Sequence, residues 1–141
     1  MTHSAIPAFD STIQTTNIWL HDIQGRLGWA EPHRAYHALR AVLHALRDRL
    51  PVDQAAALAA QLPMLVRGFY YEGWHPHGKP VKERHKEEFL AHIAAAFRDA
   101  PEVDPERVAR AVFHVLSKHV TSGEIEGVKR SLPTEIRARW S

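Results

Sequence analysis

The feature that most constrains this chain is a pattern that returns after 70 residues. Residues 40–46 read RAVLHAL, and residues 110–116 read RAVFHVL in the same register. Leu62-Pro63 likewise returns as Leu132-Pro133, with no gap needed to align the two stretches. Self-similarity at a fixed period indicates that one structural unit has been duplicated. The fold must therefore be one that two similar units can build together.

The duplication predicts how the chain is organised. A chain of 141 residues suits one domain, residues 1–141. Within it we predict two repeats, residues 12–71 and 82–141, joined by a turn at residues 72–81. The centre of this turn reads GWHPHGKP, and its glycines and prolines are typical of turns rather than of a helix.

Each repeat reads as a set of helices, because its apolar residues recur at three- and four-residue steps. The first such stripe consists of Ile13, Thr16, Leu20, Ile23 and Leu27. Ser11 and Gln14 resemble a capping box at its start, and Gly28 stands where a helix end favours glycine. No stretch alternates like a strand. We predict an all-α fold of two tandem related units, each with three helices and a short fourth helix, packed into one domain.

Pro63 and Pro133 lie where a continuous helix would be disrupted. Since a proline in a first turn loses no hydrogen bond, each is predicted to begin a short helix at an angle to the preceding one. Proline also disfavours helical geometry at the residue before it. Leu62 and Leu132 are therefore predicted to turn into the core.

The composition disfavours several classes of protein. The absence of cysteine excludes disulfides, thiolate catalysis and cysteine-bound metal, and it fits a reducing compartment. The N-terminus does not resemble a signal peptide, and the apolar run at residues 55–66 is too short to span a membrane. A net charge of +2 with scattered cations argues against nucleic acid or a membrane as a partner. We expect a soluble, cytoplasmic protein.

The turn and the two Leu-Pro elements together resemble a known family. Residues 68–74 read GFYYEGW, residues 78–80 read GKP, and residues 88–90 read EFL. An LP-x-x-hydrophobic-Arg element occurs twice, at residues 62–67 and 132–137. On these residues the chain resembles the bacterial domain-of-unknown-function family 2267 over nearly its whole length. The resemblance implies an all-helical fold with no assigned activity, so it supplies no catalytic residue.

Eleven histidines are many for this length, and four of them suggest a metal site. His33 and His37 share a helix face at a spacing of four, and His75 and His77 flank a proline in the turn. Four imidazoles could bind zinc, copper or nickel if the turn folds onto that helix. The alternative is that these are titrating surface histidines outside the family pattern.

One pair of side chains recurs in both repeats. Arg40 with His44 matches Arg110 with His114, each pair four residues apart on a helix. The pairs would form two equivalent anion or ligand pockets, or they would bridge the packing between the repeats. Duplication preserves packing as readily as sites, which favours the second interpretation.

A charged run follows the turn and offers a possible phosphate contact. Its cations are Lys79, Lys82, Arg84 and Lys86, and its acids are Glu83, Glu87 and Glu88. The interleaved acids cancel the field of the cations, so we expect a solvated face and no nucleic-acid site.

The aromatic group Phe69, Tyr70, Tyr71 and Trp74 is the most unusual feature. It either caps the core between the repeats or lines an exposed groove for a partner helix or a small apolar ligand. No nucleophile or phosphate-loop motif accompanies it. We therefore expect a non-enzymatic binding or regulatory module without a cofactor, which binds a protein partner or small ligand at this junction. The alternative is a histidine-rich metal-binding protein or metal-dependent enzyme. The oligomeric state is left open.

Overall fold

The computed structural model describes residues 5–140, and these residues form an all-α protein. The helices are α1 (Pro7–Leu27), α2 (Pro32–Arg47), α3 (Val52–Ala60), α4 (Met64–Tyr71), α5 (Lys86–Ala95), α6 (Pro105–His119), α7 (Ser122–Ser131) and α8 (Thr134–Arg137). Residues 5–140 contain no strand, and 68% of these residues are helical. The all-α prediction is confirmed. The expectations for residues 1–4 and 141 lie outside the described part of the chain.

The helix boundaries follow local capping chemistry, with one correction. Asp104 and Thr121 cap α6 and α7 by accepting hydrogen bonds from backbone amides, and Gly28 ends α1 with φ 69°. The predicted start at Ser11 is wrong, because α1 begins a turn earlier at Pro7. Proline at a first helical position has its φ already set and gives up no bond, so the helix extends back to it.

The two proline corners have the same construction. Pro63 (φ −55°, ψ 150°) and Pro133 (φ −57°, ψ 150°) are extended N-cap residues, each directly before a short helix. Leu62 and Leu132 are buried with 2% and 3% of their surface exposed, which confirms that they turn inward.

An arginine closes each corner. The Arg67 guanidinium donates to the Leu62 carbonyl at 3.0 Å, and Arg137 donates to the Leu132 carbonyl at 2.9 Å. The arginine of the repeated element therefore satisfies a carbonyl that the proline leaves outside the helix.

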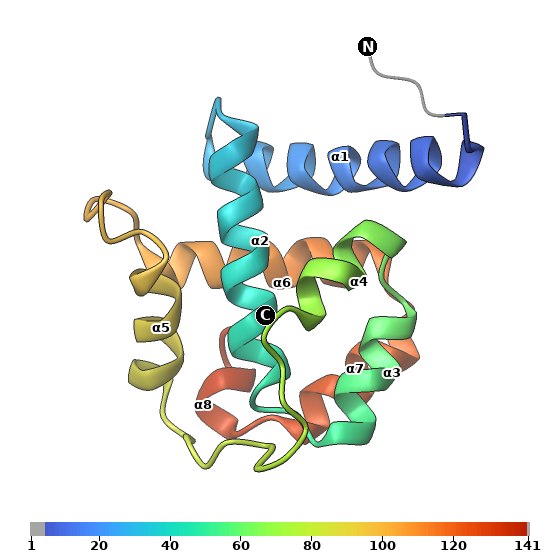
Figure 1. Cartoon of the computed structure of the whole chain (residues 1–141). Helices are drawn as coiled ribbons and strands as arrows, with labels where there is room; N and C mark the ends of the chain where they lie inside the picture. Colours follow the sequence, from blue (N-terminus) through green and yellow to red (C-terminus); the bar gives the residue numbers. More distant parts are fainter. Residues whose placement is uncertain (1–4, 141) are drawn as a thin grey trace.

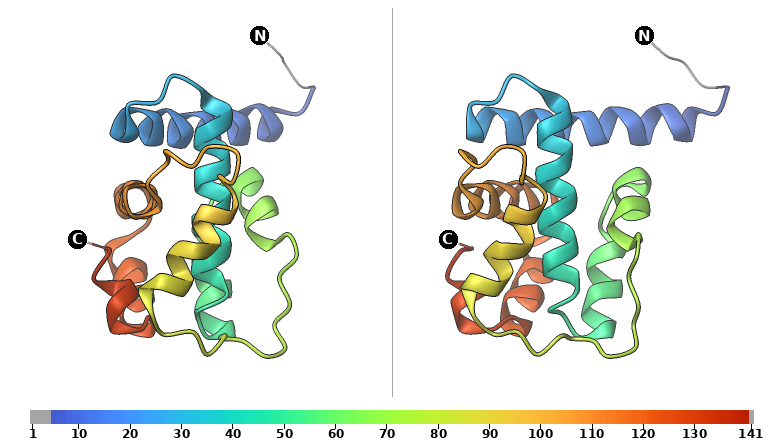
Figure 2. Two further views of the ribbon diagram at one scale, coloured as in Figure 1. Left: turned by 90° about the vertical axis from the view of Figure 1, so that its left-hand side faces the viewer. Right: turned by 60° about the vertical axis from the view of Figure 1, so that its left-hand side comes forward.

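The helices of the two halves pack reciprocally. Helix α1 packs on α6 while α5 packs on α2, and the counterparts α2 and α6, and α3 and α7, contact each other. Figures 1 and 2 show α1 at one end of the molecule and the connection between α4 and α5 at the other. Such exchanged contacts are what two units around a two-fold axis produce. The superposition of the two halves stays a prediction.

The connection between the halves is tied down at several points. The Val81 amide donates to the Asp48 carbonyl at 2.8 Å, and Arg49 pairs with Glu83 at 2.5 Å. Trp74 folds back against the core, as predicted, with its ring 5.4 Å from that of Tyr71. The segment is therefore held against the ends of the helices.

Candidate binding groove

A groove of about 980 Å³ lies between α1 and α4, with α2 contributing to its wall. Helix α1 supplies Phe9, Ile13 and Leu20, at the spacing of one helix face, while α4 supplies Met64, Leu65 and Phe69. Tyr36 of α2 also lines the groove, and its ring meets that of Phe69 edge-on at 5.2 Å. We call this the apolar groove.

Two hydrogen bonds fix the position of α4 beside its neighbours. Pro63 has no side-chain cap to offer, and instead Thr12 of α1 accepts from the Leu65 amide at 2.9 Å. His44 of α2 reaches the Phe69 carbonyl at 2.6 Å. Burial lowers the pKa of His44 below its usual value, so the imidazole is neutral at pH 7 and donates this bond.

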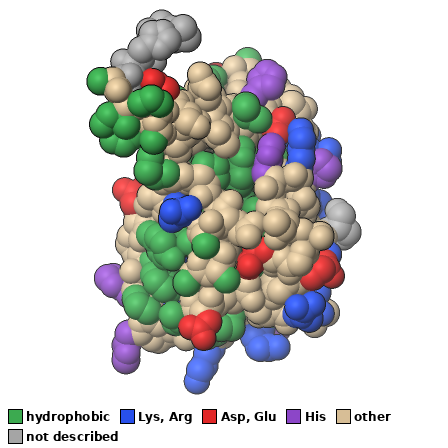
Figure 3. All heavy atoms as spheres, turned by 90° about the vertical axis from the view of Figure 1, so that its right-hand side faces the viewer, with side chains coloured by type: hydrophobic (Ala, Val, Ile, Leu, Met, Phe, Trp, Pro, Cys, Tyr) green, Lys and Arg blue, Asp and Glu red, His purple; other side chains and the backbone are tan. Residues whose placement is uncertain are grey.

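Large apolar side chains remain accessible along the apolar groove. Phe9, Ile13, Met64 and Leu65 keep 47%, 44%, 48% and 44% of their surface exposed. Figure 3 shows hydrophobic side chains gathered over the N-terminal end of α1 and again lower on the same face. A contiguous apolar surface of this kind marks an interaction site more often than scattered exposed residues do.

Gly68 leaves the apolar groove open at its α4 side. A Cβ atom added there would have no neighbour within 4 Å, although the residue lies inside a helix. Glycine in a helix interior costs about 0.5–1 kcal/mol relative to alanine. An unfilled helical glycine in the wall therefore keeps space free at a cost in stability.

The apolar groove offers little free charge. Glu72, the carboxylate in its lining, pairs with Arg40 at 3.3 Å. The buried Arg47 donates to the carbonyls of Tyr70 and Glu72 at 2.5 and 2.6 Å, which holds the C-terminal end of α4. An occupant would meet mainly apolar surface with a few hydroxyl, amide and imidazole groups.

The structure divides the predicted aromatic group. Phe69 lines the apolar groove, but Tyr70 is fully buried and donates its hydroxyl to the Ala55 carbonyl at 2.8 Å. Tyr71 and Trp74 pack against each other outside the groove lining. The interpretation of one site between the repeats needs correction, because the groove is built from the first half alone and three of the four rings serve packing.

The recurring arginine and histidine pairs do not have equivalent surroundings. Arg40 and His44 bind Glu72 and the end of α4. Arg110 instead pairs with Glu106 on its own helix at 2.8 Å, and His114 is exposed. The two pairs therefore have different neighbours, and the position one repeat period after Phe69 is Arg139, beyond the end of α8.

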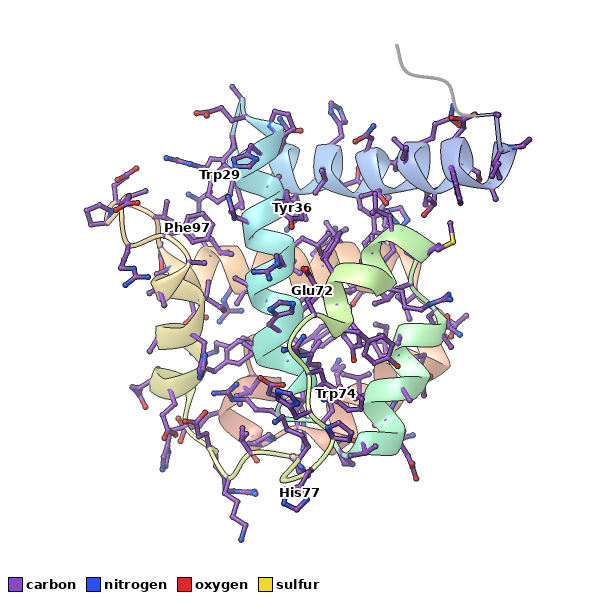
Figure 4. All side chains as sticks on the ribbon, in the orientation of Figure 1. Trp29, Tyr36, Glu72, Trp74, His77 and Phe97 are labelled. Carbon is purple, nitrogen blue, oxygen red and sulfur yellow. The ribbon has the colours of Figure 1, made fainter. Side chains whose placement is uncertain are left out.

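The four candidate metal ligands are not brought together. The Nε2 atoms of His33 and His37 lie 3.0 Å apart near the start of α2. This is the end of α2 that carries Tyr36, which Figure 4 labels. His77 lies with Trp74 in the connection at the opposite end (Figure 4). Within residues 5–140, the group with metal-ligand spacing is a different one, His85, Glu87 and Glu135.

Both carboxylate oxygens of Glu135, in this second group, already take part in hydrogen bonds. One of its oxygens lies 3.0 Å from the His85 ring and the other accepts from the Lys86 amide at 3.1 Å. The hydrogen bond to Glu135 raises the pKa of His85, and the same bond lowers the pKa of Glu135. This arrangement favours an imidazolium–carboxylate pair that joins α8 to α5 over three metal ligands.

Sequence reasoning missed most of the apolar groove. Phe9 and Ile13 continue the face of α1 beyond the part that meets the core, and this continuation is the signal that identifies one wall. Thr12 and Gly68 gave no signal, since their roles depend on how α1 and α4 meet.

The fold and groove define an all-helical protein with an accessible apolar groove. The chain matches the family of uncharacterized conserved proteins (DUF2267) over residues 16–138, and it belongs to this family. A comparison with curated proteins finds no match. No helix within residues 5–140 combines the length and the apolar character needed to cross a membrane.

Proposed function

We propose that this protein is a non-enzymatic binding module whose apolar groove accepts an amphipathic helix of a protein partner. The observation that carries the proposal is the row of half-exposed apolar side chains facing the open position at Gly68. Helix-in-groove recognition uses apolar anchors at i, i+3, i+4 and i+7 on the bound helix.

The dimensions of the apolar groove favour a helix over a small ligand. From Phe9 to Leu20 the α1 wall spans roughly 16 Å, about three helical turns. Pockets for small molecules bury most of the ligand and present a few converging polar groups. Here Phe9 and Met64 stay about half exposed, so the groove covers one face of its occupant. The only carboxylate of the lining is paired, which suits the apolar face of a helix.

Selection from a library of displayed helical peptides tests this function. Enriched peptides are expected to carry apolar residues at i, i+3 or i+4, and i+7. Their affinity should fall at least tenfold for Gly68→Leu, which fills the apolar groove. Leucine is a better helix former than glycine, so this variant keeps α4 intact.

Gly25→Leu is the matched control. Gly25 also lies inside a helix with no neighbour within 4 Å of an added Cβ, but outside the apolar groove. Peptides that bind Gly68→Leu as tightly as wild type, or a library that yields no amphipathic binder, would overturn the proposal. Self-association of the wild type that Gly68→Leu abolishes, shown by sedimentation, would assign the groove to a second copy and overturn the proposal as well.

The alternative function depends on metal. Among the described residues, the histidine pair His33 and His37 on α2 is not joined by His77, which lies in the connection at the other end of the molecule (Figure 4). Metal analysis of untagged protein tests it directly. A stoichiometric transition metal would reverse the ranking of the two functions.

A further inference from the structure

A second cavity, of about 800 Å³, lies at the other end of the molecule from the apolar groove. Its two sides are the connecting segment at residues 78–84 and the corner between α7 and α8. The buried Arg49 lines this cavity from the interior. Five further cationic residues line it near the surface: Lys79, Lys82, Arg84, Arg130 and Arg137. Among the residues that the structure describes, no carboxylate belongs to this lining. We call this cavity the basic cleft.

Arg49 is paired with Glu83, but the other cations of the basic cleft lack partners of opposite charge among the described residues. Among the described residues, Lys79, Lys82, Arg84 and Arg130 form no ion pair, although many other arginines do. Arg137 spends one donor on the Leu132 carbonyl.

Of the acids that interleave with these cations in the sequence, Glu83 contacts a cation of the lining, and the other two have contacts at the start of α5. Glu83 accepts from Arg49 at 2.5 Å, and Glu88 accepts from the His85 amide at 3.4 Å. Glu87 lies with His85 and Glu135 beside the start of α5. Glu83 therefore offsets the charge of Arg49 at the inner side of the basic cleft, while Glu87 and Glu88 have their contacts at the start of α5.

Arg49 is a buried polar group with an unused donor. Only 2% of its surface is exposed, and its Nη atoms bond the Ala45 carbonyl and Glu83. Its Nε has no hydrogen-bond partner, although buried donors are nearly always satisfied. Burial lowers the pKa of Arg49 below its usual value, a sign that Glu83 does not fully offset the cost of its desolvation.

We propose that the basic cleft binds a small, multiply charged phosphate ligand, of the class of diphosphates and triphosphates. Guanidinium and ammonium groups converge from two chain segments around one cavity, and arginine recognises phosphate oxygens in bidentate fashion. The volume falls within the range of about 300–1,000 Å³ usual for small-molecule sites. A nucleic-acid surface would instead present its cations along an open face.

Isothermal titration with pyrophosphate as the probe tests this site. Wild type is expected to bind it, with affinity that falls as salt rises. The double variant Arg84→Gln/Arg130→Gln should lose at least tenfold in affinity, since both side chains are exposed cations of the cleft. Lys79→Gln/Lys82→Gln should lose affinity to the same extent, because this variant removes the ammonium groups of the lining.

Arg26→Gln/Arg98→Gln is the matched control, because it removes the same charge from exposed positions outside the basic cleft. It should bind pyrophosphate like wild type. No binding by wild type, equal losses in all three double variants, or equal affinity for sulfate and pyrophosphate would overturn the proposal. Binding of a single-stranded oligonucleotide without measurable pyrophosphate binding would assign the surface to nucleic acid and overturn it too.

Discussion

Gln54 donates a hydrogen bond to the carboxylate of Glu124, and the two residues are 70 positions apart, which is one repeat period. The two residues lie on α3 and α7, which contact each other along their sides. In an assembly of two units around a two-fold axis, a residue touches its own counterpart only close to that axis. If the two halves are related by a two-fold axis, this contact predicts that the axis passes between α3 and α7.

The duplication makes a geometric prediction. Superposing residues 12–71 on residues 82–141 in an experimental structure should place α2 on α6 and α3 on α7, with Pro63 over Pro133 and His44 over His114. The first turns of α1 should have no partner, because α5 begins only at Lys86. Matching helices that run in different directions, or a gap needed to align them, would contradict the duplication.

The proline corners make a prediction about stability. Leu62→Ala and Leu132→Ala each remove a buried side chain, which typically costs about 2–5 kcal/mol of a total near 5–15. Pro63→Ala and Pro133→Ala should cost only about 1 kcal/mol, mainly by giving the unfolded chain more freedom. Urea melts of the four variants measure these differences. Proline variants that equal or exceed wild type in stability would mean that the prolines strain the fold.

Much of the fold is predictable from local sequence signals. The corner at Leu62 and Pro63 and the cap at Asp104 depend on neighbouring residues, and each agrees with the structure. The predicted start of α1 is wrong for a reason that is also local. Ser11 and Gln14 offered a capping box, but Pro7 offered an earlier start that the helix takes.

The candidate sites were less predictable, because they depend on contacts between distant segments. The apolar groove needs Phe9 and Met64 on two helices brought together by the fold. The basic cleft needs Glu83 to turn toward Arg49 while Arg84 stays in the lining. Alternation of charge along a sequence does not show which residues face inward.

The ion pair between α1 and α6 predicts a pH dependence of stability. Asp22 accepts from His119 at 2.8 Å and from Lys118 at 3.2 Å. The bond to His119 first, and then Lys118, lowers the pKa of Asp22 in the folded state. A carboxylate whose pKa is lowered by folding adds stability above its unfolded pKa of about 4, and this stability is lost as pH falls through the folded value.

Wild type should therefore exceed Asp22→Asn in unfolding free energy by about 1 kcal/mol at pH 7, and the difference should vanish near pH 2. Urea melts between pH 2 and 7 measure it. Asp99→Asn, at an exposed loop position, is the control and should differ little from wild type throughout. A difference between wild type and Asp22→Asn that persists at pH 2 would show that the aspartate acts by packing rather than by charge.

Two glycines make opposite predictions for the same substitution. Gly68 lies inside α4, and an added Cβ would have no neighbour within 4 Å, so Gly68→Ala should raise the free energy of unfolding by about 0.5–1 kcal/mol. Gly28 ends α1 with φ 69°, where a Cβ is strained even in open space. Gly28→Ala should therefore lower the free energy of unfolding by about 1–2 kcal/mol. Urea melts of both variants against wild type provide the measurement. A destabilising Gly68→Ala would show that the wall of the apolar groove is closed at this position, and the volume offered to a partner helix would be smaller than the structure indicates.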